Sequence, residues 1–201
     1  ITDTDTLVVG VEAIITAITA TNSSPNAVNS ATFFTVTTSI TNGVTYTWDF
    51  GDGSPAGSGS TPVHTYTTVG TYTAVVTAAN AVSAISTTTV VTITPGPVAR
   101  FVLTATTPQT VSLSFPITIT AVDAYNNLVD TFNQSVTISD TTGTIAPISV
   151  TLINGITVSN FVVYSATSPV SDTIEAITGT ITGTVGVEIR PDDPRCIKSA
   201  I

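Results

Sequence analysis

Few side chains in this sequence could do acid–base, nucleophilic or metal chemistry. His64 is the single histidine and Cys196 the single cysteine among 201 residues. A catalytic histidine needs a nucleophile and an orienting acid around it, and no Gly-x-Ser-x-Gly elbow between a strand and a helix pattern accompanies the many serines. A zinc site would need more His or Cys, and no phosphate-binding or dinucleotide-binding glycine motif occurs. The sequence therefore predicts no catalytic residues and no enzyme activity.

Calcium is the one metal that the acidic residues make worth considering. Ca²⁺ takes oxygen ligands in flexible numbers. The acidic pairs are Asp3 with Asp5, Asp49 with Asp52, and Asp192 with Asp193. A turn explains Asp49 and Asp52 without a metal, because Asp bonds the backbone amides next to it. We therefore expect no cofactor, with calcium at Asp49 and Asp52 as the alternative.

Three residues are candidates for covalent modification. Asn22 and Asn133 each begin an Asn-x-Ser sequence, the acceptor for N-linked glycans in secreted proteins. Such matches also arise by chance in a chain rich in Ser and Thr. Cys196 has no second cysteine to pair with inside the chain, so it is either an intermolecular disulfide or a spectator thiol.

The elements that must position these groups are organised around residues 46–54, Tyr-Thr-Trp-Asp-Phe-Gly-Asp-Gly-Ser. Tyr46, Trp48 and Phe50 alternate with Thr47 and Asp49, which predicts a strand with three aromatic rings on one face. A row of large rings on one face indicates a core. The glycines that follow reach backbone angles other residues avoid, so the strand is expected to end in a tight turn.

This stretch strongly resembles the signature of PKD domains, which are Ig-like β-sandwiches. The resemblance continues through residues 62–66 and 70–76 and ends at Asn80. It implies that residues 10–94 form a PKD-like sandwich, in which the Trp fills the core, the Asp-Gly turn closes a strand and His64 is packed and bonded near that turn. The signature identifies a fold rather than a function. Its structural residues are Tyr46, Trp48, Asp49, Phe50, Gly51, Asp52, Gly53, His64, Tyr66 and Tyr72.

Composition predicts an all-β protein with a neutral surface. The chain is 42% hydrophobic and only 8% charged, against about a quarter charged in ordinary domains. Thr is abundant, and it favours strands while offering water a hydroxyl. The net charge of −9 argues against nucleic acid and anionic membranes as partners. No apolar run is long enough for a transmembrane helix, and the absence of Met indicates a processed or excised product.

Within the first domain, strands are expected at residues 11–21, 32–38, 71–79 and 85–93. Phe34 and Val36 are expected to point inward, and Asn42-Gly43 is a strong hairpin signal. Residues 54–61 read as an exposed loop of small residues. Before this domain, residues 1–9 are an extension with three readings: a linker, an edge strand of the first sandwich, or a strand donated to a neighbouring subunit.

Residues 95–97, Pro-Gly-Pro, predict a short, stiff hinge before a second domain at residues 98–190. There, Phe115, Ile117, Ile119 and Ala121 predict one inward face. Residues 121–129 and 154–158 resemble bacterial Ig-like repeats of the invasin and intimin type, with an Asn at position 126 where those repeats often have Gly. The resemblance implies a second Ig-like sandwich. Residues 191–201 leave the β pattern and read as a linker or docking tail.

Two tandem Ig-like sandwiches with a Thr-rich surface predict a non-catalytic, secreted structural protein. We expect an extracellular or cell-surface filament subunit that binds copies of itself, with residues 1–9 or 191–201 completing a neighbour's sheet. The alternatives are a passive spacer in a larger surface protein, or an adhesin or polysaccharide-binding module that contacts glycans or a cell-surface protein. A sugar site needs exposed aromatic rings, for which Phe33, Tyr125 and Tyr164 are the candidates.

Overall fold

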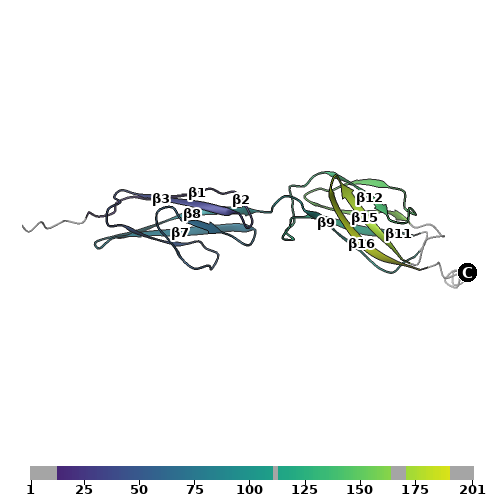
Figure 1. The fold of residues 1–201 in the computed structure, drawn as a ribbon, viewed down its shortest axis with the longest axis horizontal. Helices are drawn as coiled ribbons and strands as arrows, with labels where there is room; N and C mark the ends of the chain where they lie inside the picture. Colours follow the sequence, from purple (N-terminus) through teal and green to yellow (C-terminus); the bar gives the residue numbers. More distant parts are fainter. Residues whose placement is uncertain (1–12, 111–112, 164–170, 191–201) are drawn as a thin grey trace, which may run out of the picture. The chain divides into compact units, whose positions relative to one another are not determined.

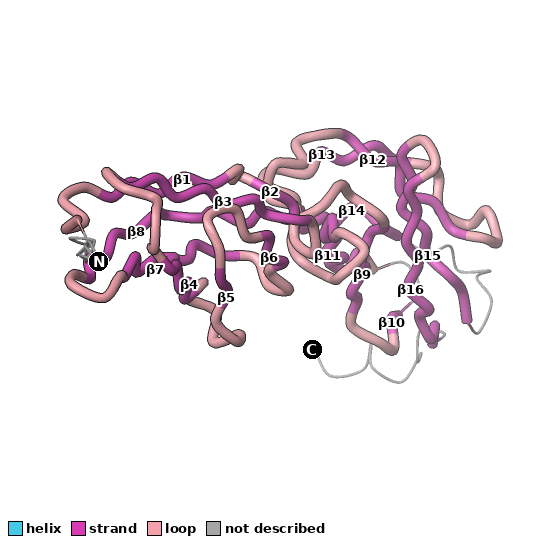
Figure 2. The backbone as a smooth tube through the Cα atoms, turned by 60° about the vertical axis from the view of Figure 1, so that its left-hand side comes forward, coloured by secondary structure: helices cyan, strands magenta, loops and turns pink. Residues whose placement is uncertain are grey.

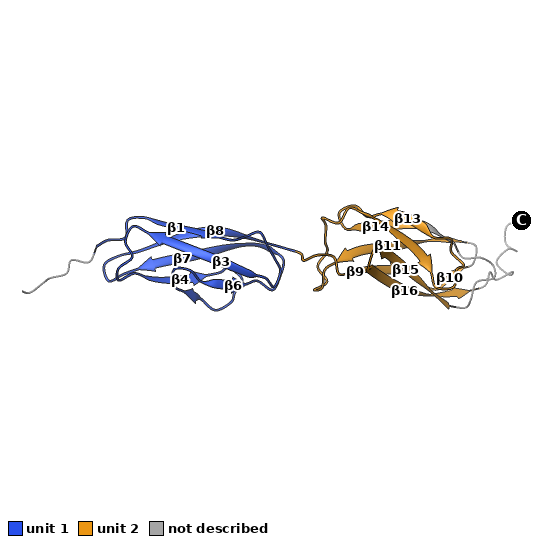
Figure 3. Cartoon of the chain, turned by 45° about the horizontal axis from the view of Figure 1, so that its top comes forward, with its two compact units in different colours: residues 1–94 blue, residues 95–201 orange. Residues whose placement is uncertain are grey.

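The computed structural model describes residues 13–110, 113–163 and 171–190. The chain divides into two compact units, residues 1–94 and 95–201 (Figures 1 and 3). Every described element is a β-strand, as the tube in Figure 2 shows. Each unit places two antiparallel-rich sheets face to face, so the prediction of an all-β chain with two tandem sandwiches is confirmed. The described part of the chain contains no helix that could cross a membrane.

Unit 1 has one sheet of three strands and one of five. The first has the order β1-β3-β6 and the second the order β2-β8-β7-β4-β5. β1 and β3 pair in antiparallel register from Ile18↔Thr38 to Asn22↔Phe34. The strands are β1 (Ile18–Asn22), β2 (Asn26–Ala27), β3 (Ala31–Thr38), β4 (Thr45–Asp49), β5 (Gly57–Ser58), β6 (Val63–Thr65), β7 (Gly70–Ala79) and β8 (Ala84–Thr94).

The core of unit 1 follows from strict alternation along its strands. In β3 every second residue is buried, so Phe34 and Val36 point inward as predicted. Trp48 is fully buried, and the Phe34 ring lies 5.1 Å from the rings of both Trp48 and Phe50. Burying such rings is the largest stabilising contribution a small sandwich has. The buried set is Val28, Phe34, Val36, Trp48, Phe50, Tyr66, Ala74, Val76, Val91 and Ile93.

Three expectations for unit 1 were wrong. The Asn42-Gly43 turn does not join a hairpin, because β3 and β4 belong to different sheets; the turn is a crossover between the layers. The opening strand of the described chain begins at Ile18 rather than before it. Residues 54–61 are not only an open loop, since Gly57 and Ser58 form β5 against β4. Turn-forming residues indicate a local bend, but they do not predict with which strand the following strand pairs.

Unit 2 repeats the two-layer plan with different pairing. One sheet has the order β14-β11-β9 and the other the order β10-β16-β15-β12-β13. β15 and β16 form a hairpin whose turn contains Gly179, at a φ of 55°. The strands are β9 (Arg100–Ala105), β10 (Gln109–Thr110), β11 (Ser114–Val122), β12 (Ser135–Asp140), β13 (Ile148–Thr151), β14 (Ile156–Val163), β15 (Ser171–Thr178) and β16 (Ile181–Arg190).

β11 supplies the central inward face of unit 2. Phe115, Ile117, Ile119 and Ala121 are all buried, as the alternation predicted. Asn126 adopts a φ of 69°, so it holds the left-handed conformation in which Gly would otherwise be placed. The rest of the core comes from Phe101, Leu103, Val129, Phe132, Val136, Ile138, Ile145, Val150, Leu152, Ile174, Ala176, Val187 and Ile189.

The segments that flank the predicted domains have different positions with respect to the described structure. The extension at residues 1–9 and the tail at residues 191–201 lie outside the described residues. The division between the units falls after Thr94, so the Pro-Gly-Pro segment belongs to unit 2. Gly96 is held there by a hydrogen bond of 2.9 Å from its N–H to Asp123 Oδ2.

The two glycines of the motif turn provide a matched test of this packing. Both have positive φ, 77° at Gly51 and 78° at Gly53, but a Cβ at Gly51 would lie 2.5 Å from the Thr73 carbonyl oxygen, whereas one at Gly53 meets nothing. Gly53→Ala should cost about 1–2 kcal/mol from the left-handed backbone. Gly51→Ala should cost about 1–3 kcal/mol more from the clash. Urea unfolding followed by Trp48 fluorescence measures unit 1 alone; equal losses would contradict the close packing.

Candidate functional site

The motif turn in unit 1 is built from carboxylates that bond their own backbone. Asp49 Oδ1 accepts a hydrogen bond from the Gly51 N–H at 2.9 Å, where β4 ends. Asp52 Oδ1 accepts from the Ser54 N–H at 3.1 Å and from the Ser54 hydroxyl at 2.5 Å. These are the short-range bonds by which Asp stabilises turns. Both acids of the motif therefore act first on the loop that carries them.

His64 closes this turn from β6. Its Nε2 lies 2.7 Å from Asp52 Oδ2, and its ring stacks on Phe50 at 4.1 Å with an interplanar angle of 1°. The Tyr66 ring also contacts the imidazole, edge-on, with ring centroids 4.7 Å apart. The residue is thus clamped between two aromatic rings and one carboxylate.

Ser54, His64 and Asp52 do not have the arrangement of a catalytic triad. In a triad the serine and the acid lie on opposite ring nitrogens. Here the Ser54 hydroxyl and Asp52 Oδ2 approach the same Nε2, at 3.5 and 2.7 Å. The hydroxyl donates to Asp52, so it is tied to the acid and is not activated by the imidazole. The arrangement can hold a loop and cannot generate a nucleophile.

The Asp52 carboxylate is stabilised as an anion. Partial burial raises the pKa of Asp52, but hydrogen bonds from the Ser54 hydroxyl and from His64 outweigh that effect and hold the pKa below its ordinary value. Burial acts unopposed on Tyr66, whose phenol pKa is raised. The Tyr66 hydroxyl donates to the Phe50 carbonyl at 3.0 Å, so it joins β6 to the end of the motif strand.

The described residues offer little for a calcium ion at the motif turn. Both Asp52 oxygens and Asp49 Oδ1 already accept hydrogen bonds, and no group of three His, Cys, Asp or Glu side chains is gathered in the described part of the chain. Ca²⁺ takes six to eight oxygens, so two engaged carboxylates fall well short. The pairs Asp3/Asp5 and Asp192/Asp193 lie outside the described residues.

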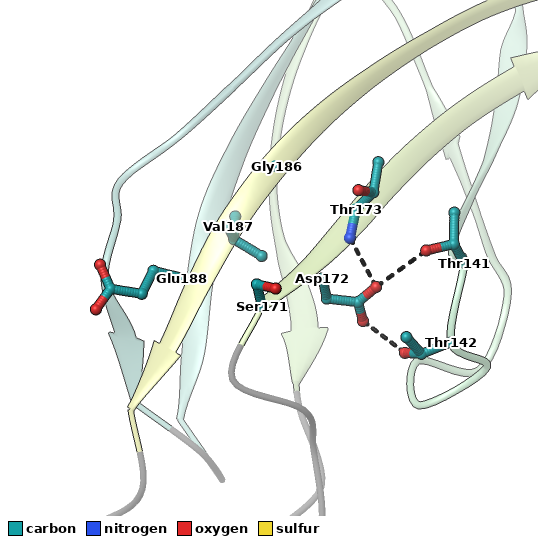
Figure 4. A pocket seen from close by; sticks show the side chains of 8 residues that line it. All are labelled: Thr141, Thr142, Ser171, Asp172, Thr173, Gly186, Val187 and Glu188. Carbon is teal, nitrogen blue, oxygen red and sulfur yellow. Dashed lines mark hydrogen bonds between the residues drawn. The ribbon is translucent and has the colours of Figure 1, made fainter.

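A second polar cluster, in unit 2, was not found from the sequence. The carboxylates of Asp140, at the end of β12, and Asp172, on β15, share the hydroxyl of Thr142, which lies 2.7 Å from an oxygen of each. Thr144 donates to Asp140 at 2.6 Å, and Thr141 to Asp172 at 3.3 Å. Figure 4 shows the Asp172 carboxylate directed at Thr141 and Thr142, while Glu188 points away. The cluster borders an open pocket of about 390 Å³.

The physical role of this cluster is to fix the loop after β12. Besides the hydroxyls, Asp140 accepts the N–H groups of Thr144 at 2.7 Å and Ile145 at 3.0 Å. Burial raises the pKa of Asp140, yet the hydroxyls of Thr144 and Thr142 and the two amides outweigh it and hold the pKa well below its usual range. The turn residues Asp-Thr-Thr-Gly-Thr were a local signal for this loop. Asp172 had no local signal, because its partners are far away in sequence.

Asp123 is the third carboxylate that organises a loop. It is buried, and its Oδ1 accepts the N–H groups of Tyr125 and Asn127 at 2.9 Å each. The Asn127 amide and the Gly96 N–H bond its Oδ2. Burial raises the pKa of Asp123, but these donors outweigh it and lower the pKa. The turn at residues 123–127 was predicted; its bond to the segment before β9 was not.

The modification candidates occupy different environments. The Asn22 side-chain nitrogen donates to Thr89 Oγ1 at 2.7 Å and to the Val90 carbonyl at 2.8 Å, so a glycan there would displace two bonds. Asn133 is exposed; its side chain donates to the Thr131 carbonyl at 3.2 Å and accepts from the Asn154 N–H at 2.8 Å. Glycosylation at either residue remains a prediction. Cys196, the candidate for an intermolecular disulfide, lies outside the described residues.

Replacement of Asp140 tests the loop-fixing role and its pH dependence. Because its folded pKa is below the ordinary 3.8, the carboxylate stabilises the fold above that pH, and the stabilisation is lost as the pH falls through the folded value. Asp140→Asn should lower the unfolding free energy at pH 7 by about 1.5–3 kcal/mol, and the difference from the unmodified chain should shrink below pH 3.8. Scanning calorimetry across pH measures this. The exposed Asp130→Asn is the control; equal losses in both variants would contradict the role.

Comparison with known proteins agrees with the geometry of unit 1. The model of the PKD domain family matches residues 17–93, a range that contains the whole motif turn, His64 and Tyr66. No curated protein matches the chain significantly.

Several solved structures resemble the chain at low identity. The PKD1 domain of Vibrio anguillarum Epp is 24% identical, with 41% of this chain and 99% of that chain covered and a TM-score of 0.34. The D0-D1 domain of intimin is 19% identical, with 87% and 98% covered and a TM-score of 0.35. A glycosyl hydrolase family 2 member from Bacteroides cellulosilyticus is 14% identical, with a TM-score of 0.41. The match covers 84% of this chain but only 24% of that chain.

PKD domains are generally non-catalytic modules and are typical of extracellular or cell-surface proteins. The motif turn, the clamped histidine and the buried Trp48 occupy the matched range. Residues 17–93 therefore form a PKD domain, and a second two-layer β-sandwich follows it in the chain.

Proposed function

We propose that the chain is a non-catalytic structural segment of an extracellular filament or surface appendage, assembled by strand donation between copies. The observation that carries the non-catalytic part is the use of the buried or half-buried acids. The side-chain oxygens of these acids all accept hydrogen bonds from nearby residues. The acids are Asp52, Asp123, Asp140 and Asp172. A site for chemistry would instead direct a polar group at a substrate position.

The outer sheet faces support a structural role. Hydroxyls on neighbouring strands bond each other: Thr19 with Thr37 at 2.6 Å, Thr77 with Ser86 at 2.8 Å, and Ser135 with Thr151 at 2.9 Å. Each pair adds a cross-strand interaction of the kind that stabilises sheets. Such faces stay hydrated without charge, which suits a surface module that must remain folded and soluble outside the cell.

Assembly by strand donation follows from the open edges that two sandwiches leave. An edge strand presents unpaired N–H and C=O groups, and covering it with a strand from a neighbour satisfies those groups. A head-to-tail contact of this type repeats and produces a filament. The candidate donors are residues 1–9 and residues 191–201.

A binding function is the second candidate, and one surface feature favours it. Phe33 and Val63 face each other across β3 and β6, and both side chains are more than half exposed. An exposed ring beside an aliphatic group can stack on a sugar ring of a polysaccharide. Tyr125 is also exposed but belongs to the other unit, and Tyr164 lies outside the described residues. Phe33 and Tyr125 are isolated rings and do not form a row of stacking platforms. We therefore prefer the filament proposal to a sugar-binding function.

Electron microscopy of the natively secreted material tests the proposal. Filaments are expected, with a repeat close to the length of two sandwiches. Deleting residues 1–9 should abolish them while both units still unfold at the original temperature, because no described core residue is removed. Deleting residues 191–201 separately tests the other donor. Single-chain particles from the unmodified protein would refute self-assembly and direct attention to glycan binding by Phe33.

A further inference from the structure

On β14, an edge strand of unit 2, polar side chains face the core and apolar side chains face outward. On β14, Thr157 and Ser159 face the core beside Ile119 and Ile117 of β11, and Ser159 is buried. Ile156 and Val158 instead lie on the outer face, beside Thr120 and Thr118, and are exposed. A strand that contributes only to its own sandwich would turn its apolar residues inward. The reversal therefore points to a second apolar contact on the outside.

The exposed residues around β14 form one uncharged patch. Ile153 is paired with Ile156 across the Asn154-Gly155 turn, and Leu128 lies against that turn, with its Cδ1 3.0 Å from the Cβ position of Gly155. All of these apolar side chains are exposed. Contiguous apolar surface of this kind marks an interaction site more often than chance exposure does. The patch comprises Leu128, Ile153, Ile156 and Val158.

The backbone of β14 has an open side suited to an added strand. β14 is the end strand of its sheet, and its eight residues make it the longest edge strand in the described structure. The Gly155 carbonyl bonds Ala121 of β11, so by antiparallel alternation Val158 directs its N–H and C=O groups away from β11. The register with β11 shifts after Ser159. Ile156 bonds Ile153 through both of its groups. An added strand would therefore pair from Val158 onward.

The segment before the described structure matches this edge in chemistry and reach. Residues 6–9, Thr-Leu-Val-Val, carry no charge, and Leu7 and Val9 share one face of an extended chain. The 12 residues that precede Ala13 span about 40 Å when extended at about 3.3 Å per residue, longer than an eight-residue strand. Each chain carries a net charge of −9, so an uncharged segment on an uncharged edge avoids the repulsion that two copies would otherwise meet.

We propose that the β14 edge is the acceptor for residues 6–9 of a second copy of this chain. The inference rests on the proposed strand donation, and it names both the donor segment and the acceptor edge. The donor begins to pair at Val158 through its backbone and places Leu7 and Val9 beside the apolar patch. The sheet then gains a fourth strand at its β14 edge, and the contact repeats from copy to copy.

A charge at the edge tests the acceptor. Val158→Asp places a carboxylate in the pairing site, whereas Val90→Asp places one on β8 of unit 1 at nearly the same exposure, 63% against 60%. In sedimentation velocity and electron microscopy of the full chain, Val158→Asp should raise the concentration needed for assembly at least tenfold. Val90→Asp should assemble as the unmodified chain does. Thermal unfolding of both variants verifies that they fold.

The outcomes separate this inference from the proposal on which it rests. If the unmodified chain assembles through residues 1–9 and Val158→Asp assembles equally well, strand donation stands and the acceptor is wrong. If the unmodified chain stays monomeric, both are wrong.

Disulfide trapping identifies the occupant. In a Cys196→Ser background, a chain with Leu7→Cys is mixed with a chain with Val158→Cys, and oxidation should yield a cross-linked dimer. Replacing Val158→Cys by Val90→Cys should abolish that product. A single chain that carries both Leu7→Cys and Val158→Cys shows whether the disulfide forms within one chain or between two chains. A bond formed only within that single chain would overturn the assignment to a second copy.

Discussion

The burial of one indole ring sets the structure of the whole motif region. Trp48 is fully buried between the sheets, and its Nε1–H must find an acceptor there, because an unpaired buried donor is costly. The acceptor is the Gly59 carbonyl at 3.0 Å, which brings residues 57–59 back against β4. Gly57 then lies so close to the Phe50 ring that a side chain would not fit. The indole hydrogen bond and the backbone pairing with β4 together hold this loop of small residues in place as the short strand β5.

The same packing explains why the lone histidine is structural. The Phe50 ring packs against Phe34 and stacks on the His64 imidazole. The turn after Phe50 brings Asp52 within reach of the imidazole. The Asp52 carboxylate then bonds both the Ser54 N–H within the turn and the Nε2 of His64. Removing any one partner leaves the others packed around a gap. The contacts of the His64 ring and of its Nε2 therefore join β6 to the motif turn.

Period-two alternation predicted much of the fold because each sheet buries one face. It placed Phe34 and Ile117 correctly, and the aromatic spacing located the first core. It could not predict sheet membership at Asn42-Gly43, since a bend into a hairpin and a bend into a crossover use the same residues. Nor could it find the Asp140–Asp172 cluster, whose members meet only through tertiary pairing of β12 and β15. Local patterns determine which residues are buried, and long-range pairing determines which polar groups meet.

The edges of the two units differ in a way that bears on association. In unit 1 the edge strands β2, β5 and β6 have two or three residues each and the edge strand β1 has five, so each offers a shorter backbone edge than β14 does. Unit 2 leaves the eight residues of β14 at an edge, and it places aliphatic rather than charged residues on the outer face there. Proteins that remain monomeric usually protect such an edge with Lys, Pro or a bulge. The exposed stretch of β14 from Ile156 to Ser159 has no Lys and no Pro, and the irregularity in its pairing with β11 begins only after Ser159. This unprotected stretch is where the proposed partner strand begins to pair.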